Sequence, residues 1–422
     1  MTCKQLLMVT TAFPYGQGES FVDAELAYMG VTFEAVTLVP CYFTADKPPR
    51  PVRHGVELAY ASARWGNARF MHVAVSLVRA LWRYPWLGEA MSILKRAHRR
   101  ENLKELVRSL YRARLFEQFL QRQWRAGKHY DMIYFYWIVP EIAGALSFRH
   151  RSGTAAPRPV IVARGHGGDL YEERRAGGYA GLTDTITAGV DAVFCISEHG
   201  RGYLANKYPA LAGRFHLARL GVDDPGFVNP QPRDCGLSIL SCSFMVPGKR
   251  IHLIVDAIDV LLRQHPALRV RWTHIGDGEL FEHLQAYVTR MLDTRRVEVI
   301  FKGYMRQPDL VAFYRDAAFD VIVNVSDSEG IPVSLMEASS VGIPMVATDV
   351  GGSGEIVNSS NGLLIDECAD AATIAAALLK FHDRQTAVTY RKGARAYWNA
   401  HFNARINYVQ FGQALHRSME QR

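Results

Sequence analysis

The 422-residue chain has few of the features that mark membrane-spanning or disulfide-bonded proteins. No apolar run approaches the roughly 18–20 residues of a membrane-spanning helix, so no such helix is expected. The first residues enter a strand-like segment without the apolar stretch and cleavage site of a secretory signal. The six cysteines are scattered and include no Cys-x-x-Cys pair. They predict reduced thiols in a cytoplasmic protein rather than disulfides or a metal site.

Internal repeats and low-complexity tracts are also lacking, and the composition is that of a globular protein. Hydrophobic residues make up 49% of the chain and charged residues 21%, which is ordinary for a folded soluble domain. A chain of this length is expected to form two domains of about 200 residues, each with its own core.

Short β-branched segments alternate with helical patterns, as in doubly wound parallel sheets of the α/β class. The predicted strands of the first half cover residues 5–11, 33–39, 131–138, 160–164, 192–197 and 215–220. Those of the second half cover 237–243, 269–276, 297–303, 320–325, 344–349 and 362–366. Between the two sets, residues 221–236 are rich in Gly, Pro and Asp and show no periodicity. The domain boundary is therefore expected there.

One segment carries most of the functional information. Residues 319–326 (FDVIVNVS) predict a buried parallel strand, and residues 326–330 (SDSEG) follow it as a turn. Pro332 suits the first position of a helix, and Gly342 suits the residue just past its end. The free backbone N–H groups near 330–334 would then favour a phosphate, together with the helix dipole.

Glu329 and Glu337 lie eight residues apart in this segment, one before the predicted helix and one inside it. A pyrophosphate at the helix tip would have ribose hydroxyls on one side and sugar hydroxyls on the other. Carboxylates accept hydrogen bonds from neighbouring hydroxyls, so both glutamates are candidate residues for binding a nucleotide sugar. The alternative is that both are solvated charges at the ends of a helix.

The segment EGIPVSLMEASSVGIPMVATDVGGSGEIV (329–357) resembles the donor-site signature of retaining glycosyltransferases of the glycosyltransferase 4 family. The likeness continues through 241–250, 274–280 and 301–305 in the family's order, and more weakly through the segments TTAFPYGQGESFVDAEL and ARGHGGDLYEE. It implies the GT-B architecture, in which two Rossmann-like domains face a cleft and a C-terminal helix crosses back. The expected domains are an N-terminal acceptor-side domain, a donor domain and the returning helix, at 1–222, 223–400 and 401–422.

The resemblance also implies which residues hold the donor. Lys249 follows a predicted strand and would neutralise the departing diphosphate. Gly276 and Gly278 lie in a loop near the nucleotide, although a simple turn explains them equally well. With Glu329 and Lys249 as catalytic residues, the implied donor-binding residues are Glu337, Gly330, Ile331, Pro332, Val333, Gly276, Gly278 and Arg250.

The chain departs from the family's pattern at Phe244, where an arginine usually stands five residues before the lysine. An arginine would contact phosphate in a bidentate manner. Arg250 is adjacent to Lys249. It could replace the missing arginine in part, or its side chain could point into solvent. The departure leaves three possibilities open: a slow enzyme, an altered donor geometry, or a chain that binds a donor without turnover.

In the first half, His166 follows a predicted buried strand and is flanked by glycines, so it is expected to be exposed in a loop. The resemblance places it as a catalytic residue near the transferred sugar, with Arg164 and Asp169 framing its ring. Gly16 and Gly18 lie in a loop before a helix and would let the backbone approach a ligand.

The resemblance further implies retention of anomeric configuration, with the departing phosphate oxygen taking the acceptor's proton. No motif supplies a dedicated general base, and the pair Asp327 and Glu329 does not require a metal, because Lys249 and backbone amides can carry the diphosphate charge. No cofactor or metal is expected beyond the nucleotide sugar itself.

Positive charge is concentrated in residues 83–128, with twelve Lys/Arg and four Glu. Their net charge of +8 equals that of the whole chain. A basic amphipathic segment with tryptophans suits an anionic membrane surface, where a lipid-linked acceptor would lie. The alternative is a solvated basic face. Nucleic-acid binding is not expected, because no recognised binding module accompanies the charge.

Together these patterns predict a retaining, metal-independent glycosyltransferase of hexosyltransferase type. It would move a sugar from a nucleotide sugar to a glycan or polyprenyl-diphosphate-linked acceptor in bacterial surface polysaccharide synthesis. The expected location is the cytoplasm, peripheral on the inner membrane. Two alternatives stay open: a non-catalytic nucleotide-sugar-binding partner or sensor, and a GT-B epimerase or phosphorylase.

Overall fold

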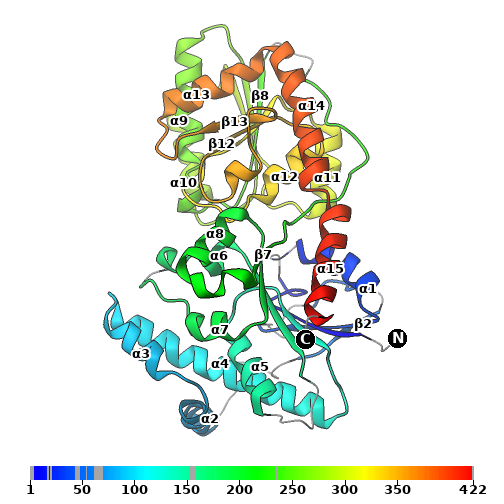
Figure 1. Cartoon of the computed structure of the whole chain (residues 1–422). Coiled ribbons are helices and arrows are strands. Elements are labelled where there is room, and N and C mark those ends of the chain that lie inside the picture. The colour runs from blue at the N-terminus through cyan, green and yellow to red at the C-terminus, as the bar shows by residue number, and fades with distance from the viewer. Residues whose placement is uncertain are drawn as a thin grey trace. The chain divides into compact units, whose positions relative to one another are not determined.

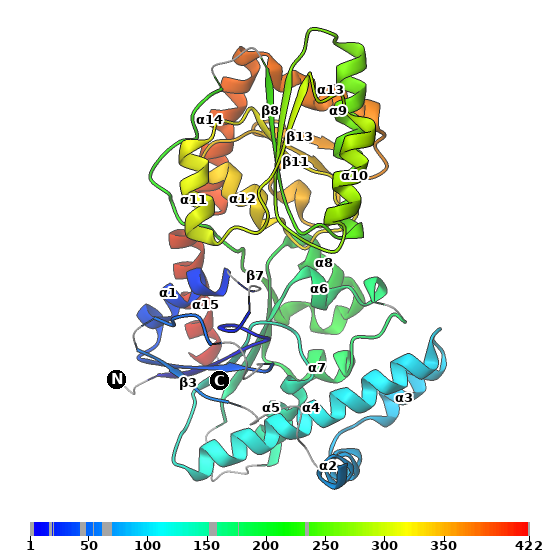
Figure 2. The same cartoon turned by 180° about the vertical axis from the view of Figure 1, so that it is seen from behind.

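Two fully parallel sheets form the framework of the chain, and each has helices on both faces (Figures 1 and 2). The computed structural model describes residues 4–16, 19, 21–42, 48–53, 55–60, 70–151, 158–175, 177–232 and 236–420. By their internal contacts the residues divide into two units. The first comprises Met1–Ala218 and Tyr408–Arg422, and the second comprises Arg219–Asn407.

The first unit contains a seven-stranded sheet in the order β3-β2-β1-β4-β5-β6-β7. Its strands are β1 (Gln5–Thr10), β2 (Ala35–Pro40), β3 (Val56–Leu58), β4 (Met132–Phe135), β5 (Val160–Gly165), β6 (Ala192–Cys195) and β7 (Phe215–Leu217). Its helices are α1 (Phe21–Thr32), α2 (Phe70–Arg83), α3 (Leu87–Leu94), α4 (Arg99–Arg125), α5 (Glu141–Arg151), α6 (Gly167–Leu170), α7 (Thr183–Gly189) and α8 (Glu198–Lys207).

Alternate residues of these strands fill two separate cores, because successive side chains of a strand point to opposite faces. Leu7 and Val9 of β1 belong to the core under α4 and α5. Leu6 and Met8 of the same strand belong to the core under α1. Both cores continue across β4, β5 and β6, so the central strands are buried on both faces.

The second unit contains a six-stranded sheet in the order β10-β9-β8-β11-β12-β13. Its strands are β8 (Leu237–Cys242), β9 (Val270–Ile275), β10 (Val297–Phe301), β11 (Val321–Asn324), β12 (Met345–Thr348) and β13 (Gly362–Ile365). Its helices are α9 (His252–Gln264), α10 (Phe281–Met291), α11 (Gln307–Asp316), α12 (Val333–Ser340), α13 (Ala371–Leu379) and α14 (Arg384–His401). In both views α9, α10 and α13 cover one face, and α11, α12 and α14 cover the other.

The final helix, α15 (Ala404–Glu420), joins the two units within a single element. It begins in the second unit, and from Tyr408 onward its residues belong to the first. Phe411 and Leu415 pack in the core under α1. Among the described residues, no helix is both long enough and apolar enough to cross a membrane.

All twelve predicted strands are present, with ends that differ by a few residues at most. The parallel, doubly wound arrangement is confirmed. The prediction omitted β3, a three-residue strand at the edge of the first sheet. Its short sequence, Val-Glu-Leu, offers too little alternation to be recognised as a strand.

A buried ion pair crosses the core of the first unit. Arg164, at the end of β5, is fully buried and pairs with Glu25 of α1. The Glu25 carboxylate also accepts a hydrogen bond of 2.6 Å from the Tyr134 hydroxyl. Burial raises the pKa of Glu25, while Arg164 and Tyr134 act in the opposite direction. The guanidinium lies 4.4 Å from the ring centre of Phe411 on α15.

This environment corrects the prediction that Arg164 orients His166. Arg164 is a structural residue that holds α1 and α15 against the sheet through Glu25 and Phe411. The sequence could not show this, because both partners come from segments far away in the chain.

We expect Arg164→Leu to lower the free energy of unfolding of the first unit by about 3–5 kcal/mol, because it leaves the Glu25 carboxylate buried without its cation. Urea unfolding followed by circular dichroism measures the change. Arg201→Leu is the matched control, since Arg201 forms an exposed pair with Glu198 on α8. The control should change stability by about 0–1 kcal/mol. Equal effects of the two substitutions would contradict the structural role of Arg164.

Candidate functional site

The loops that follow β8, β11 and β12 meet at one edge of the second sheet, because these strands are adjacent and parallel. In the first loop, a 3-10 turn over Pro247–Lys249 places the Lys249 ammonium 2.6 Å from Oε1 of Glu329. The same oxygen accepts hydrogen bonds from Asn324 Nδ2 at 3.0 Å and Ser326 Oγ at 2.7 Å. We call these four residues the Glu329 cluster.

The Glu329 carboxylate is only 8% exposed, so its neighbours in the cluster supply the donors that a buried charge needs. The structure thus brings together Lys249 and Glu329, two residues that the sequence assigned to one site. It also gives Glu329 a positioning role, which the sequence did not predict. The carboxylate fixes the ammonium of Lys249 at the carboxyl edge of the sheet, where parallel α/β folds commonly bind ligands.

Arg250 links the first loop to the second. Its backbone is left-handed, with φ at +46°, and its guanidinium donates to three backbone carbonyls. The acceptors are Val325 at 2.8 Å, Ser326 at 2.9 Å and Glu367 at 2.9 Å. These contacts correct the expectation that Arg250 faces a phosphate or solvent. It holds the loops together instead.

The third loop contributes two glycines that pack directly on the second. A Cβ atom at Gly351 would lie 1.9 Å from the carbonyl oxygen of Glu329, and Gly351 has φ at +53°. The Gly352 amide donates to the carbonyl of Gly330 at 3.0 Å. Only residues without a side chain allow this approach. The Gly-Gly pair of the motif is therefore explained by packing around Glu329.

Helix α12 begins one residue later than predicted. Pro332 is the N-terminal capping residue with an extended backbone, and Val333 is the first helical residue. The carbonyl of Pro332 accepts from the amides of Leu335 and Met336. The amides of Val333 and Ser334 lie in the first turn, where α-helices offer no internal acceptor. The first turn of α12, which begins four residues after Glu329, therefore offers two N–H donors that the helix itself does not use.

Glu337 lies on α12 and is half-buried. Removal from water raises the pKa of its carboxyl to about 7, against which a hydrogen bond from Gln307 acts. No ion pair of Glu337 occurs among the described residues. Its carboxyl is thus poised to be neutral or charged near neutral pH, and either form accepts hydrogen bonds from hydroxyl groups.

The loop after β9 is shaped by its glycines. Gly276 has φ at +137°, and a Cβ atom there would lie 1.8 Å from the carbonyl oxygen of Ser243. A Cβ atom at Gly278 would lie 2.5 Å from the carbonyl oxygen of Met245. Both glycines therefore let the loop pack against residues 243–245. Their predicted contact with the nucleotide stays a prediction.

Phe244 lies between these glycines and Lys249, in the loop after β8. Its side chain is 56% exposed. A large aromatic side chain that faces water at this position is not part of the core. It is therefore available to a ligand or to an engineered replacement.

In the first unit, His166 is only 4% exposed, which corrects the prediction that its glycine neighbours leave it in an open loop. Its ring centre lies 4.3 Å from that of Trp137, 5.0 Å from that of Tyr136 and 6.0 Å from that of Phe21. These rings come from segments distant in sequence. Together they enclose the imidazole.

The electrostatics of His166 keep its ring neutral. Burial and the positive charge of Arg164 lower its pKa well below the usual value, while a hydrogen bond to the backbone of Tyr136 acts in the opposite direction. Nε2 is buried and has no hydrogen-bond partner among the described residues. We therefore assign the bond to Tyr136 to Nδ1, and in this tautomer of the neutral ring Nε2 is an acceptor.

Asp169 fixes the backbone beside this histidine rather than its ring. Its carboxylate accepts from the amide of His166 at 2.7 Å and from that of Ile138 at 2.8 Å. Burial raises the pKa of Asp169 to about 7. Asp169 thus frames His166, as predicted, but through the main chain.

Glu19 is a site residue that sequence reasoning missed. Its carboxylate accepts from the amides of Ala12 at 2.7 Å and Phe13 at 2.6 Å, and from Nε1 of Trp137 at 2.5 Å. It therefore connects the first loop to the tryptophan under His166. Gly16 is exposed in that loop, with φ at +70°, while Gly18 lies outside the described residues.

Six of the twelve basic side chains in 83–128 form ion pairs with described residues, three of them with carboxylates outside the segment. The buried Glu117 of α4 accepts from Arg83 at 2.7 Å and from Arg114 at 2.8 Å. Arg112 forms a bidentate pair with Glu141, at 2.9 and 2.7 Å. These basic side chains are engaged within the protein, and contact of the remaining ones with an anionic membrane stays a prediction.

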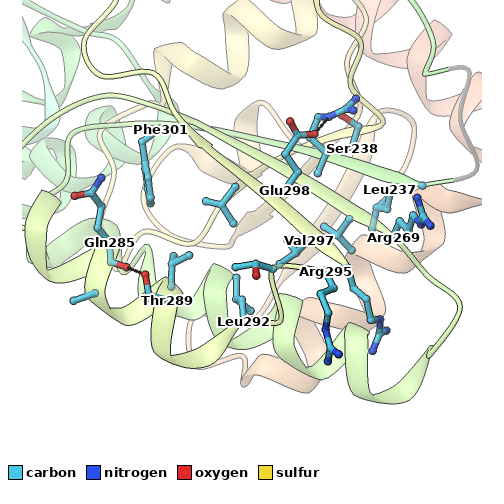
Figure 3. A pocket seen from close by; sticks show the side chains of 18 of the residues that line it. Leu237, Ser238, Arg269, Gln285, Thr289, Leu292, Arg295, Val297, Glu298 and Phe301 are labelled. Atoms are coloured by element: carbon cyan, nitrogen blue, oxygen red, sulfur yellow. Dashed lines mark hydrogen bonds and ion pairs between the residues drawn. The ribbon is translucent and has the colours of Figure 1, made fainter.

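A hollow of about 1240 Å³ lies elsewhere in the second unit, along α10 and the edge strand β10 (Figure 3). Leu237 and Val297, which line it, are the first residues of their strands. The hollow is therefore at the amino ends of strands in the parallel sheet. The Glu329 cluster lies at the carboxyl ends, so this hollow is not the candidate site.

Sequence comparisons connect the chain with known proteins. Residues 237–384 match the family model described as glycosyl transferases group 1. The amylovoran biosynthesis glycosyltransferase AmsK of Erwinia amylovora is 28% identical over 215 residues, which cover 49% of this chain and 51% of AmsK. The O-antigen biosynthesis glycosyltransferase WbnH of Escherichia coli is 41% identical over 192 residues, covering 42% of this chain and 52% of WbnH. The chain thus spans about half the length of these curated relatives.

The solved structure of Anabaena HepE in complex with UDP has a similar fold. It aligns with 98% of this chain and 100% of its own, with a TM-score of 0.64 and 18% sequence identity. At this identity the likeness concerns the fold alone.

We expect Glu337→Gln to change how stability depends on pH. Because the folded-state pKa of about 7 lies above the usual 4.5, the folded chain keeps a proton that the unfolded chain releases, and stability falls as pH rises between these values. Between about pH 5 and pH 8 the unsubstituted chain should lose about 2–3 kcal/mol of unfolding free energy that the variant does not lose. Urea unfolding at both values measures this difference.

The control for this prediction is Glu282→Gln, which removes an exposed carboxylate of α10 in the same unit. Its difference from the unsubstituted chain should stay within about 0.5 kcal/mol at both pH values. Parallel stability curves for Glu337→Gln and the unsubstituted chain would contradict the raised pKa.

Proposed function

We propose that this chain, whose second unit carries a group 1 glycosyltransferase domain in a protein of GT-B fold, transfers a sugar from a nucleotide-sugar donor to a glycan or lipid-linked oligosaccharide. The match over 237–384 and the GT-B fold support the resemblance to group 1 glycosyltransferases, while retention of configuration stays part of the proposal. The observation that carries the proposed activity is the Glu329 cluster. It holds an ammonium group on the carboxylate of Glu329, four residues before α12 begins, so a diphosphate bound at the start of this helix would find a cation and the first-turn amides.

In the proposed reaction, the bond between the anomeric carbon and the diphosphate oxygen breaks, and the acceptor hydroxyl oxygen forms the new bond on the same face of the sugar. The departing phosphate oxygen takes the acceptor's proton. Lys249 and the first-turn amides of α12 stabilise the charge that develops on the diphosphate. Glu329 positions Lys249, and Glu337 accepts a hydrogen bond from a hydroxyl of the donor.

His166 is proposed to accept a hydrogen bond from a sugar or acceptor hydroxyl through Nε2. Nε2 is buried and has no partner in the described ranges, so it carries a desolvation cost that a hydrogen bond from a bound hydroxyl would remove. The stacked rings of Trp137 and Tyr136 hold the imidazole in place. In this role His166 orients a reactant and transfers no proton, which agrees with its lowered pKa.

The proposed acceptor belongs to bacterial surface polysaccharide synthesis, because the matched relatives act in amylovoran and O-antigen biosynthesis. A polyprenyl-diphosphate carrier would place the reaction at the cytoplasmic face of the inner membrane. The basic residues of 83–128 that form no internal ion pair are proposed to contact anionic lipid there. Lys95, Arg99 and Arg100 are exposed examples around the start of α4.

Nucleotide release from UDP-, GDP- and ADP-sugars, with and without membrane extract, tests the transferase proposal. One donor should release nucleotide only when extract is present, and a chelator should not abolish release. Among the described residues, no three His, Cys, Asp or Glu side chains are grouped to hold a metal ion. Release without extract would favour an epimerase, and binding without release would favour a sensor.

We expect Lys249→Gln to lower kcat/KM for the active donor about ten- to hundredfold, because one charge-assisted contact to the diphosphate is lost. Initial rates of nucleotide release measure the effect. Lys392→Gln is the matched control, since Lys392 is an exposed lysine on α14 of the same unit. An unchanged rate for Lys249→Gln would remove the proposed role of the Glu329 cluster.

Phe244→Arg separates a slow transferase from a chain that binds a donor without turnover. The exposed position admits an arginine without disturbing the core, and the family pattern has a phosphate-binding arginine there. We expect nucleotide release to rise about tenfold, in line with one added charge-assisted hydrogen bond. Phe244→Gln, which adds no charge, should leave the rate unchanged. Donor binding without release in both variants would favour the sensor.

A further inference from the structure

A basic pocket lies in the first unit, between α2, α4 and α5. It has a volume of about 440 Å³. It is lined by Val78, Arg79, Trp82 and Arg83 of α2, Arg114 of α4 and Arg151 of α5. In both views of the fold, α2 lies beside α4 (Figures 1 and 2). Four guanidinium groups thus surround one hollow.

Two of these arginines are fixed by the protein itself. Arg83 and Arg114 both pair with Glu117, which is completely buried beneath them. Glu117 also accepts a hydrogen bond of 2.9 Å from the Tyr84 hydroxyl. One carboxylate therefore orients two guanidinium groups and neutralises only one of their charges. The inner part of the pocket is preorganised and remains positive.

The other two arginines form no ion pair with any described residue. Arg79 and Arg151 are both exposed, and they come from the ends of different helices. With one carboxylate for four guanidinium groups, the pocket has a net charge of +3. Guanidinium groups donate in a planar fork that matches phosphate oxygens, so the chemistry of the pocket is that of a phosphate-binding site.

The rim of this pocket is apolar. Exposed apolar side chains beside the arginines favour a membrane surface, rather than a dissolved anion, as the partner. Trp82 is 88% exposed, and Val78 and Leu81 on the same helix are exposed as well. Eight of the sixteen large hydrophobic side chains exposed in the described residues lie between positions 78 and 107. Tryptophan favours the boundary between headgroups and acyl chains, while arginine favours the headgroup phosphates.

We propose that this pocket binds the phosphate of an anionic phospholipid while Trp82 and its apolar neighbours enter the bilayer interface. Helix α2 then lies in the plane of the membrane surface. The proposal deepens the membrane contact of the proposed function and moves its centre from the basic helix α4 to α2. It rests on that contact but not on sugar transfer, so vesicle binding without donor or acceptor tests it separately.

The first experiment measures sedimentation of the full chain with vesicles of phosphatidylglycerol and phosphatidylcholine, and with phosphatidylcholine alone. Binding should require phosphatidylglycerol. The double substitution Arg79→Gln with Arg151→Gln should weaken it about ten- to thirtyfold, from about fivefold for each basic residue at an anionic surface. Neither arginine forms an ion pair within the part of the chain that the structure describes, so thermal unfolding should not change.

The matched control is Lys392→Gln with Arg405→Gln, which removes two exposed charges from α14 and α15 in the second unit. It should weaken vesicle binding less than about twofold. Equal weakening by the two double variants would show general charge attraction and overturn the pocket.

A second measurement uses vesicles whose acyl chains carry bromine, which quenches nearby tryptophans. The unsubstituted chain should be quenched, and Trp82→Phe should lose most of the quenching while it still binds. Inorganic phosphate alone should not displace the chain from vesicles. Displacement by phosphate together with unchanged quenching in Trp82→Phe would identify a site for a soluble anion and overturn the membrane proposal.

Discussion

The candidate donor site depends on one buried carboxylate. Glu329 receives the ammonium of Lys249, the amide of Asn324 and the hydroxyl of Ser326, and its own backbone is covered by Gly351. A buried charge is tolerated only when its partners are in place, so the cluster forms as a whole or not at all. Because its members come from the loop after β8, the end of β11 and the loop after β11, while Gly351 comes from the loop after β12, their meeting fixes the edge of the sheet where a phosphate would bind.

The first unit uses charge in the same way at sites unrelated to a donor. Glu25 holds Arg164, and Glu117 holds Arg83 and Arg114, each inside a helix-covered face of the sheet. In both cases the carboxylate is fully buried, so these pairs set the relative placement of helices. Arg83 and Arg114 also line the basic pocket, so a buried carboxylate can orient a cation that still faces a ligand. Arg164, which is itself fully buried, serves the structure alone.

The strands were predictable from sequence because parallel strands buried on both faces have a strong local signature, and residues 319–326 show it well. The sequence also predicted a shared site for Lys249 and Glu329, because both lie in motifs that follow one another as in the resembling family. The burial of His166 was not predictable, because its covering rings come from distant segments. The same holds for Arg164, whose partner is 139 residues away. The role of Arg250 was predicted wrongly for a different reason. No local sequence pattern distinguishes an arginine that binds backbone carbonyls from one that binds phosphate.

The path of the chain through α15 has a consequence for how this protein can be recombined. The second unit is a continuous segment, Arg219–Asn407, while the first is split around it. Exchange of the two halves at a single crossover would separate Phe411 and Leu415 from the core they complete. A donor domain from another protein can therefore enter only as an inserted cassette with two junctions. The second of these junctions falls inside a helix, so the cassette must also preserve the helical phase.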